Sequence, residues 1–397
     1  MSSAGHIDLE NHEALFAVGD IHGDMFALLQ VLKLTKCVQI DPVHFHKSSR
    51  CWTNQTYAGD LQLKKRASLN AIDKTITWTG GSQVILFLGD ILDNRRGSDQ
   101  PSEGMCSLPN TQFQILDILV HLKQQAQIEN GDIVWVLGNH DVWNVSPVAP
   151  ICHRYGAATQ QCDNEKFCTD RTVYSACDER GFFSKRHRDN VRNYMKAMDV
   201  VALCRITTTG KEGKTHVLAL HGGLTDIPAL LRDVGLRGGG GEDNIDAVNT
   251  LYHSAIFEHN QKAFSVIEKE YMPTWCRPKH VENANDLVMY FGTARMLKGH
   301  DVQRLRGGGR ANCNVGSKPT GIFKGNEHFT GRKIMEDGEL CRMDVGMSRA
   351  FELGGSTKEF ACVRLTSTDG RMYRQLFRIV EEINADNKYP RYSVELE

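Results

Sequence analysis

Aspartate, histidine and asparagine residues stand next to glycine at five places in the chain, and each place follows an apolar stretch. The five segments are Gly19–Asp24, Gly89–Asp93, Gly138–Asp141, His221–Gly223 and Gly299–Asp301. Carboxylate, imidazole and amide groups together suit Mn, Fe or Zn ions rather than calcium. The simplest common purpose of the five segments is therefore one metal site.

The residue types within these segments suit two ions rather than one. Asp20 and His22 are two positions apart, so an extended or turning backbone can aim both side chains the same way. The Asp90 carboxylate has two oxygens and can bridge two cations. Neutral ligands for the second ion are available from Asn139, His221 and His300. Two divalent ions about 3.5–4 Å apart can activate a shared water and clamp both oxygens of an in-line displacement, which is the chemistry of phosphate ester hydrolysis.

Strands must deliver these side chains. The apolar runs at residues 14–18, 84–88, 132–137 and 215–220 predict buried strands that end at the polar segments. Helices are predicted from about 24 to 34 and from about 110 to 127, so strand, helix and strand alternate and the strands pair in parallel through right-handed crossovers. Ligands of such sheets bind outside the carboxyl ends of the strands. We therefore expect an α/β fold with the site in one crevice.

Length and charge limit the other possibilities. The chain has 397 residues with a formal net charge of -1, so nothing draws it globally toward nucleic acid or an anionic membrane. We predict one domain at residues 12–382, with insertions at about 41–82 and 147–188 and terminal extensions at 1–11 and 383–397. Neither a secretory signal nor a membrane-spanning run is seen, which predicts a soluble, cytoplasmic protein.

The second insertion carries four cysteines in one polar stretch. These are Cys152, Cys162, Cys168 and Cys177. Their spacing contains no paired C-x-x-C unit, which favours unpaired thiols in a surface insertion over a structural zinc site.

Laid side by side, the polar segments resemble the motifs of the calcineurin-like metallophosphoesterase superfamily, and within it the phosphoprotein phosphatase family. The matching segments, in order, are Gly19–Gly23, Gly89–Asp93, Gly138–Asp141 and His221–Gly223. Trp78–Asp90 and Met343–Ser348 look like the Shewanella-like branch of that family. The resemblance covers roughly residues 14 to 366 and implies a four-layer α/β/β/α sandwich with mixed sheets.

The resemblance also implies a role for individual residues. The metal ligands would be Asp20, His22 and Asp90 for the first ion, and Asp90, Asn139, His221 and His300 for the second. His140 would protonate the leaving alcohol, and Asp93 would orient its imidazole, while a hydroxide that bridges the two metals attacks phosphorus directly. The candidates for a guanidinium that clamps the phosphate are Arg95, Arg96 and Arg277.

The chain departs from the family pattern at three places. Asn94 follows Asp93 where the family commonly has arginine, which leaves open which arginine clamps phosphate. Asp141 stands where many protein phosphatases have glutamate. His300 is not followed by a second metal-binding histidine two positions on, which favours the phosphoprotein phosphatase pattern over the nuclease and purple-acid types.

The predicted function is a binuclear metal-dependent phosphatase that acts on phosphorylated proteins or small phosphomonoesters, with no regulatory partner indicated. An alternative with the same chemistry is a hydrolase of dinucleoside polyphosphates or phosphodiesters, for which Trp52, Tyr57 and Tyr155 could stack on a base. A third hypothesis is a binding or scaffold protein that has lost turnover. The presence of all six predicted metal ligands argues against it.

Overall fold

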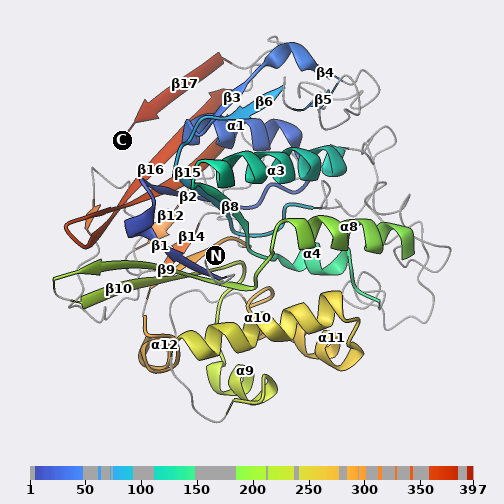
Figure 1. Ribbon diagram of the computed structural model, residues 1–397, viewed down its shortest axis with the longest axis vertical. Helices are drawn as coiled ribbons and strands as arrows, with labels where there is room; N and C mark the ends of the chain where they lie inside the picture. Colours follow the sequence, from blue (N-terminus) through green and yellow to red (C-terminus); the bar gives the residue numbers. More distant parts are fainter. Residues whose placement is uncertain are drawn as a thin grey trace.

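Two mixed β-sheets form the centre of the computed structural model (Figure 1). The first has the order β1 (His6–Asp8), β9 (Leu203–Gly210), β10 (Gly213–Leu220), β11 (Met296–Lys298), β14 (Leu340–Arg342), β12 (Asn312–Asn314). The second has the order β13 (Glu327–His328), β16 (Arg371–Glu382), β15 (Thr357–Thr368), β2 (Leu15–Val18), β7 (Val84–Phe87), β8 (Asp132–Trp135), and β17 (Arg391–Leu396) pairs with β16. The structure describes residues 5–47, 61–63, 72, 75–92, 111–147, 185–211, 213–236, 241–276, 284–293, 295–300, 312–314, 327–328, 340–342, 357–382 and 391–396.

Helices and two small sheets complete the described part of the chain. The α-helices are α1 (Met25–Thr35), α3 (Thr111–Ile128), α4 (Asn139–Trp143), α8 (Lys185–Ala197), α9 (Ile227–Asp233), α10 (Glu242–Phe257), α11 (Gln261–Ile267) and α12 (Ala284–Phe291). Short 3-10 helices are η1 (Leu9–Asn11) and η2 (Pro42–His44). The small sheets pair β3 (Val38–Ile40) with β6 (Ile76–Trp78), and β4 (Phe45–Lys47) with β5 (Leu61–Leu63).

The helices cover the outer faces of the two central sheets. α1 packs on β15 and α3 packs on β8 of the second sheet, whereas α10 packs on β9 of the first (Figure 1). Every residue of β2 and β7 is buried, as expected for strands enclosed on both faces. The fold is therefore mixed α/β with two mixed sheets between helices, which confirms the predicted fold class.

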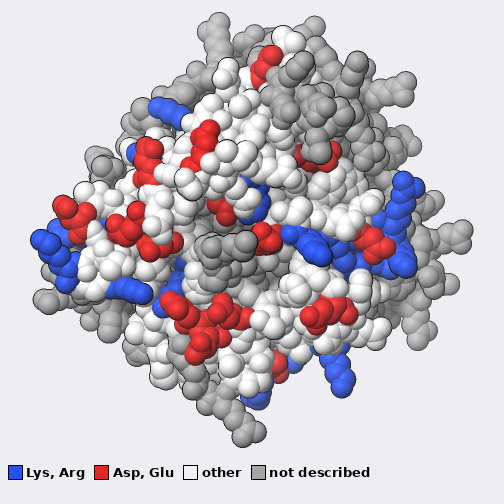
Figure 2. All heavy atoms as spheres, viewed as in Figure 1, with Lys and Arg blue, Asp and Glu red and all other residues white. Residues whose placement is uncertain are grey.

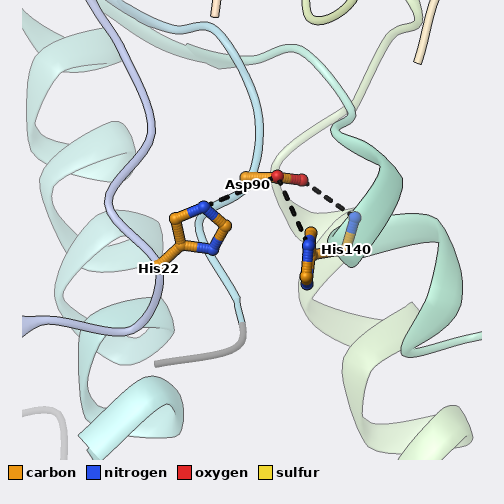
Figure 3. A group of neighbouring side chains, drawn as sticks. All are labelled: His22, Asp90 and His140. Atoms are coloured by element: carbon orange, nitrogen blue, oxygen red, sulfur yellow. Dashed lines mark hydrogen bonds and ion pairs between the residues drawn. The ribbon is translucent and has the colours of Figure 1, made fainter. Parts of the chain in front are cut away.

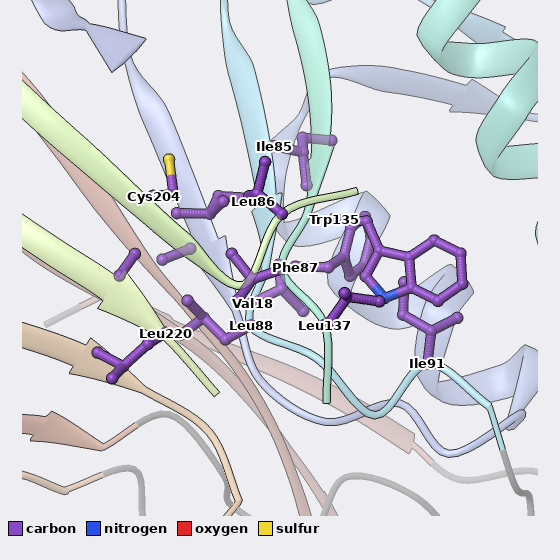
Figure 4. Close-up of a cluster of buried hydrophobic side chains, with 14 of the residues drawn as sticks. Val18, Ile85, Leu86, Phe87, Leu88, Ile91, Trp135, Leu137, Cys204 and Leu220 are labelled. Atoms are coloured by element: carbon purple, nitrogen blue, oxygen red, sulfur yellow. The ribbon is translucent and has the colours of Figure 1, made fainter. Parts of the chain in front are cut away.

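Apolar side chains of both sheets meet in one core. Figure 4 shows Val18, Leu86 and Leu88, from β2 and from β7 and its end, gathered with Cys204 of β9 and Leu220 of β10. All five side chains are fully buried. The interior between the sheets is thus a closely packed apolar layer, and it fixes the two sheets against each other.

Parallel pairing brings the polar segments to one edge. β2, β7 and β8 are parallel neighbours, with Leu15 opposite Val84 and Val84 opposite Asp132. In the other sheet β10 and β11 are parallel, with Leu220 opposite Lys298. The loops that follow these five strands therefore start from the carboxyl ends of both sheets, where α/β proteins bind ligands.

Strands form within both of the predicted terminal extensions. Residues 6–8 form β1, which pairs in parallel with β9, and residues 391–396 form β17, which pairs antiparallel with β16. β1 depends on backbone pairing with residues about 200 positions away, for which the sequence has no local signal, whereas β17 pairs with the strand that precedes it. The first predicted insertion contains the hairpin of β4 and β5, while 148–184 of the second lies outside the described residues, cysteines included.

The helical layer from α9 to α12 was not predicted. Figure 1 shows these helices together on the side of β9 and β10. In α10 the buried Ile245, Val248, Tyr252 and Ile256 recur at helical spacing, which is the signal that could have identified it, and α10 packs on β9, α11 and α12.

Surface charge is mixed over the viewed face of the molecule. Figure 2 shows acidic and basic side chains interspersed, with basic groups gathered over α8, where Lys185 and Arg186 are exposed. Among the described residues, none of the helices is long and apolar enough to cross a membrane.

Candidate metal centre

Three of the predicted ligands occupy unusual backbone conformations just past the ends of strands. His22 after β2, Asp90 after β7 and His300 after β11 have φ values of 47°, 48° and 69°. Residues other than glycine in this left-handed region cost about 1–3 kcal/mol each and persist where the surrounding structure holds them, often at functional sites. The strain turns each chain sharply at the strand end, so the side chain faces the crevice.

The first group of candidate ligands consists of His22, Asp90 and His140, whose ligand atoms lie within 4.8 Å of one another. Figure 3 shows that they come from three different segments, the loop after β2, the loop after β7 and the start of α4. Asp90 Oδ2 lies 3.7 Å from His22 Nε2 and 4.0 Å from His140 Nε2. All three side chains are buried. His140, which we predicted as a proton donor, thus lies among the candidate ligands.

The second group consists of Asp90, His221 and His300, and it shares Asp90 with the first. His221 Nδ1 lies 2.7 Å from the carbonyl oxygen of Leu88, and since that oxygen only accepts, Nδ1 carries the hydrogen. The lone pair of neutral His221 is therefore on Nε2. Three further potential ligand atoms approach it: Asn139 Oδ1 at 3.0 Å, His300 Nδ1 at 3.0 Å and Asp90 Oδ2 at 3.3 Å.

This arrangement fits a metal ion chemically. Oxygen and nitrogen lone pairs of four side chains converge on one place in a buried setting, where a cation would satisfy them together. A metal-binding histidine commonly donates its other ring hydrogen to a backbone carbonyl, as His221 does to Leu88. Two groups that share one carboxylate are suited to two ions.

Asp20 lies beside both groups but belongs to neither. Its Oδ2 is 3.8 Å from His22 Nε2, and its Oδ1 is 3.8 Å from His221 Nδ1. Asp20 is fully buried, so its carboxylate remains part of the same charged interior. All six predicted metal ligands are therefore brought together.

Gly138 permits the close approach of two of these segments. A Cβ atom on Gly138 would lie 2.2 Å from both the backbone N and Oδ1 of Asp90. The backbone N–H of His140, two residues on, donates to Asp90 Oδ1 at 2.8 Å. The glycine that precedes the Asn-His pair is thus needed for the Asp90 carboxylate to contact the start of α4.

The pKa values of two buried aspartates, Asp90 and Asp141, shift in opposite directions. Burial alone would raise the pKa of Asp90, but the imidazoles of His221, His140 and His22 hold it well below its usual value. Burial, together with the charge of Asp90, raises the pKa of Asp141 to about 6. Asp90 is thereby kept ionised, which is the form that binds cations.

Asp141 organises the loop from inside α4. Its Oδ2 accepts hydrogen bonds from the backbone N–H of Gly138 at 2.9 Å and from Trp135 Nε1 at 3.0 Å, and its Oδ1 accepts from the N–H of Leu92 at 3.1 Å. The carboxylate thus caps the first turn of α4 and ties it to the loop after β7.

Two neighbours of His140 were missed by the sequence analysis. The rings of His140 and Trp143 meet edge to face at a centroid distance of 4.6 Å, and Asn144 Nδ2 donates to the His140 carbonyl oxygen at 2.8 Å. Both residues follow His140 at helical spacing, three and four positions on, which is the signal that could have identified them.

Four predicted site residues lie outside the described residues. They are Asp93, Arg95, Arg96 and Arg277. Their roles stay predictions.

Comparison with known proteins agrees with this geometry. The family model of the calcineurin-like phosphoesterases matches residues 15–302, which include all six predicted metal ligands. Shewanella-like protein phosphatase 2 of Arabidopsis thaliana is 27% identical over 141 residues, or 35% of this chain and 32% of the relative. The matched part thus spans about a third of that relative.

Solved structures share the fold. A cold-active protein tyrosine phosphatase from a psychrophilic Shewanella species has a TM-score of 0.50 at 14% identity, covering 96% of this chain and 82% of the other. Another structure of a cold-active protein tyrosine phosphatase has a TM-score of 0.50 at 13% identity and covers 98% of this chain and 80% of the other. Likeness at this level of identity concerns the fold alone.

Proposed function

Since this chain belongs to the calcineurin-like phosphoesterase family, we propose that it is a metal-dependent phosphatase that hydrolyses phosphomonoesters on phosphorylated proteins. The observation that carries the proposal is the approach of Asp90, Asn139 and His300 to the lone pair of His221. A second group, which shares Asp90 with the first, supports a two-ion site. The order of the motifs supports the same assignment.

The proposed ligands of one ion are Asp20, His22 and Asp90, and those of the other are Asp90, Asn139, His221 and His300. When bound, the two ions would activate water as the nucleophile and stabilise charge on the phosphoryl oxygens. Mn, Fe and Zn suit this set of oxygen and nitrogen donors. Asp90 is the proposed anionic ligand of both ions, because it is the carboxylate that the two groups share.

His140 is the proposed general acid. Its Nε2 is 4.0 Å from Asp90 Oδ2, so the imidazole adjoins the place where phosphate would bind. A protonated imidazole there can give its proton to the leaving oxygen of the ester, which removes the need to expel an alkoxide. Asp93 is the proposed partner that orients this ring, and Arg95, Arg96 and Arg277 are the proposed phosphate clamps.

Protein substrates are proposed because the Arabidopsis relative is named a protein phosphatase. Whether the phosphorylated residue is serine, threonine or tyrosine depends on loops around the metals. Small phosphomonoesters remain the simplest test substrates for the shared chemistry.

The first experiment compares p-nitrophenyl phosphate with bis-p-nitrophenyl phosphate as substrates, with and without added Mn²⁺, alongside Asn139→Ala and His140→Ala. We expect Mn²⁺-dependent turnover of the monoester, which Asn139→Ala loses, whereas His140→Ala loses mainly the turnover of a phosphoserine peptide, whose leaving oxygen needs a proton. A preference for the diester would replace the proposal with a phosphodiesterase. Absence of turnover by protein that holds two metals would replace it with a binding or scaffold role.

A further inference from the structure

A buried hydrogen-bonded pair, Asn144 and His187, lies behind the His140 peptide. Asn144 Nδ2 donates to the carbonyl oxygen of His140 at 2.8 Å, and the Asn144 backbone N–H donates to the same oxygen at 3.2 Å. Asn144 Oδ1 lies 2.8 Å from His187 Nε2. Asn144 is fully buried and His187 is 6% exposed, so water cannot replace these contacts cheaply.

The direction of the pair is set by chemistry. Because the Asn144 amide nitrogen donates to a carbonyl, its oxygen faces His187 and can only accept. His187 must therefore carry a hydrogen on Nε2. The chain of donors runs from His187 to Asn144 and from Asn144 to His140, and each step polarises the next.

The His140 peptide is consequently held on both sides. Its N–H donates to Asp90 Oδ1 at 2.8 Å, and its carbonyl oxygen accepts from Asn144. α4 is only five residues long, so its own hydrogen bonds are too few to fix its position. The hydrogen bonds to Asp90 and from Asn144 therefore fix the position of the His140 peptide.

His187 is itself fixed by the packing of α8. Its ring meets Phe113 of α3 edge to face at a centroid distance of 5.6 Å. Five residues on, Arg192 donates from Nη2 to the Val145 carbonyl oxygen at 2.7 Å and from Nε to the Ile256 carbonyl oxygen at 2.9 Å. α8 thus binds the segment just after α4 through two side chains, His187 to Asn144 and Arg192 to Val145.

We propose that His187 and Asn144 are a positioning pair that aims the His140 imidazole at the leaving oxygen of the substrate. The inference rests on the proposed function, in which His140 is the general acid. Neither residue contacts the reacting atoms, and both act through the His140 peptide. Displacing a catalytic group by about 1 Å can cost about 100-fold in rate, so the pair contributes to kcat rather than to substrate binding.

The leaving group provides a specific readout. p-Nitrophenolate leaves without needing a proton, whereas a serine alkoxide must be protonated as the bond to phosphorus breaks. A misaimed His140 therefore slows hydrolysis of a phosphoserine peptide much more than that of p-nitrophenyl phosphate. A general loss of folding or of metal would slow both reactions alike.

The experiment compares His187→Leu, His187→Gln and Asn144→Asp with the wild type on both substrates. Glutamine can donate an amide hydrogen to Asn144 Oδ1, whereas leucine fills similar space without a donor. The Asn144→Asp variant would keep an acceptor for His187 but lose the side-chain donor to the His140 carbonyl oxygen. Tyr194→Phe is the matched control, because the Tyr194 hydroxyl of α8 donates to Asp117 of α3 and not to the pair. Bound Mn²⁺ and hydrogen exchange of residues 139–147 are measured for each.

We expect His187→Leu and Asn144→Asp to lower kcat for the phosphoserine peptide by about 10–100-fold, with KM unchanged and p-nitrophenyl phosphate turnover reduced less than about threefold. Hydrogen exchange of residues 139–147 should become faster, with Mn²⁺ content unchanged. His187→Gln should recover most of the lost rate. Tyr194→Phe should resemble the wild type on both substrates.

Equal losses on the two substrates, a Tyr194→Phe defect as large as that of His187→Leu, or wild-type rates in His187→Leu would each overturn the positioning role. These outcomes differ from failure of the proposed function. If the wild type itself turns over neither monoester with Mn²⁺ bound, the phosphatase assignment fails. If it turns them over and the variants do not separate the leaving groups, only the positioning role fails.

Discussion

The backbone N–H of His300 donates to both carboxylate oxygens of Asp20, at 3.1 and 3.2 Å, although 280 residues separate them in the chain. The contact joins the carboxyl end of β2 in one sheet to that of β11 in the other. It orients Asp20 between His22 and His221 and leaves the imidazole of His300 to face Asp90 and His221.

Gly299→Ala should disrupt this junction. A Cβ atom at Gly299 would lie 2.2 Å from Asp20 Oδ1 and 3.0 Å from the Leu88 carbonyl oxygen, so either the carboxylate or the strand end must move. We expect Mn²⁺ affinity to fall at least about tenfold and stability to fall by about 1–3 kcal/mol. Equilibrium dialysis and urea unfolding measure the two effects. Gly81→Ala, where the added carbon meets open space but φ is 55°, is the control for Mn²⁺ affinity alone, and Mn²⁺ affinity equal to that of Gly81→Ala would contradict the prediction.

Asp90→Asn should abolish most of the stabilisation by metal. Mn²⁺ at about 100 times its Kd should stabilise the wild type by about 2.7 kcal/mol, seen as a rise in Tm that a chelator reverses. The variant loses the charged ligand shared by both groups, so its rise in Tm should be less than about half as large. Asp246→Asn removes an exposed carboxylate that belongs to neither group and should keep the full rise. A full rise in Asp90→Asn would show that the ions bind elsewhere.

Trp143→Ala should harm both stability and catalysis. Trp143 is buried between His140, at a ring distance of 4.6 Å, and Trp275, at 5.0 Å. The cavity should cost about 3–5 kcal/mol in urea unfolding, and the freed His140 ring should lower kcat about tenfold or more. Trp78→Ala, a comparable truncation at the buried Trp78 of β6, should lose stability with normal kcat. Equal loss of kcat in the two variants would argue against a specific role of Trp143.

His216 should make the protein less stable in acid. Burial, aided by the charges of Arg205 and Lys214, lowers the pKa of His216 from 6.5 to about 4. The unfolded chain therefore takes up a proton on this side chain at a higher pH than the folded one does. The stability contributed by neutral His216 is complete above pH 6.5 and is lost as the pH falls toward 4.

His216→Gln removes this titration and keeps a hydrogen-bonding side chain near Thr207, whose Oγ1 lies 3.0 Å from His216 Nδ1. Because His216 is only partly buried, we expect the wild type to lose about 1–2 kcal/mol more than the variant between about pH 7 and about pH 4.5. Urea unfolding at both pH values measures the difference. Parallel losses in the two proteins would mean that His216 titrates normally in the fold.

The sequence was sufficient to predict the strands that carry the site and the polar segments at their ends. β2, β7, β8 and β10 lie where continuous apolar runs predict them, and each run ends at a polar segment. The pattern that predicts these strands is local, because a strand enclosed on both faces needs apolar side chains on both faces. The fold brings the six predicted ligands together, and it adds His140 to them.

Tertiary structure alone decided how the ligands group and what supports them. β1 pairs with β9, whose residues lie about 200 positions away in the chain. The meeting of His140 with Asp90 and His22 depends on where α4 begins, and the contact of Asn144 with His187 depends on how α8 packs. Such contacts join residues far apart in the chain, and their energies come from burial and geometry that exist only once the two sheets and their helices have assembled.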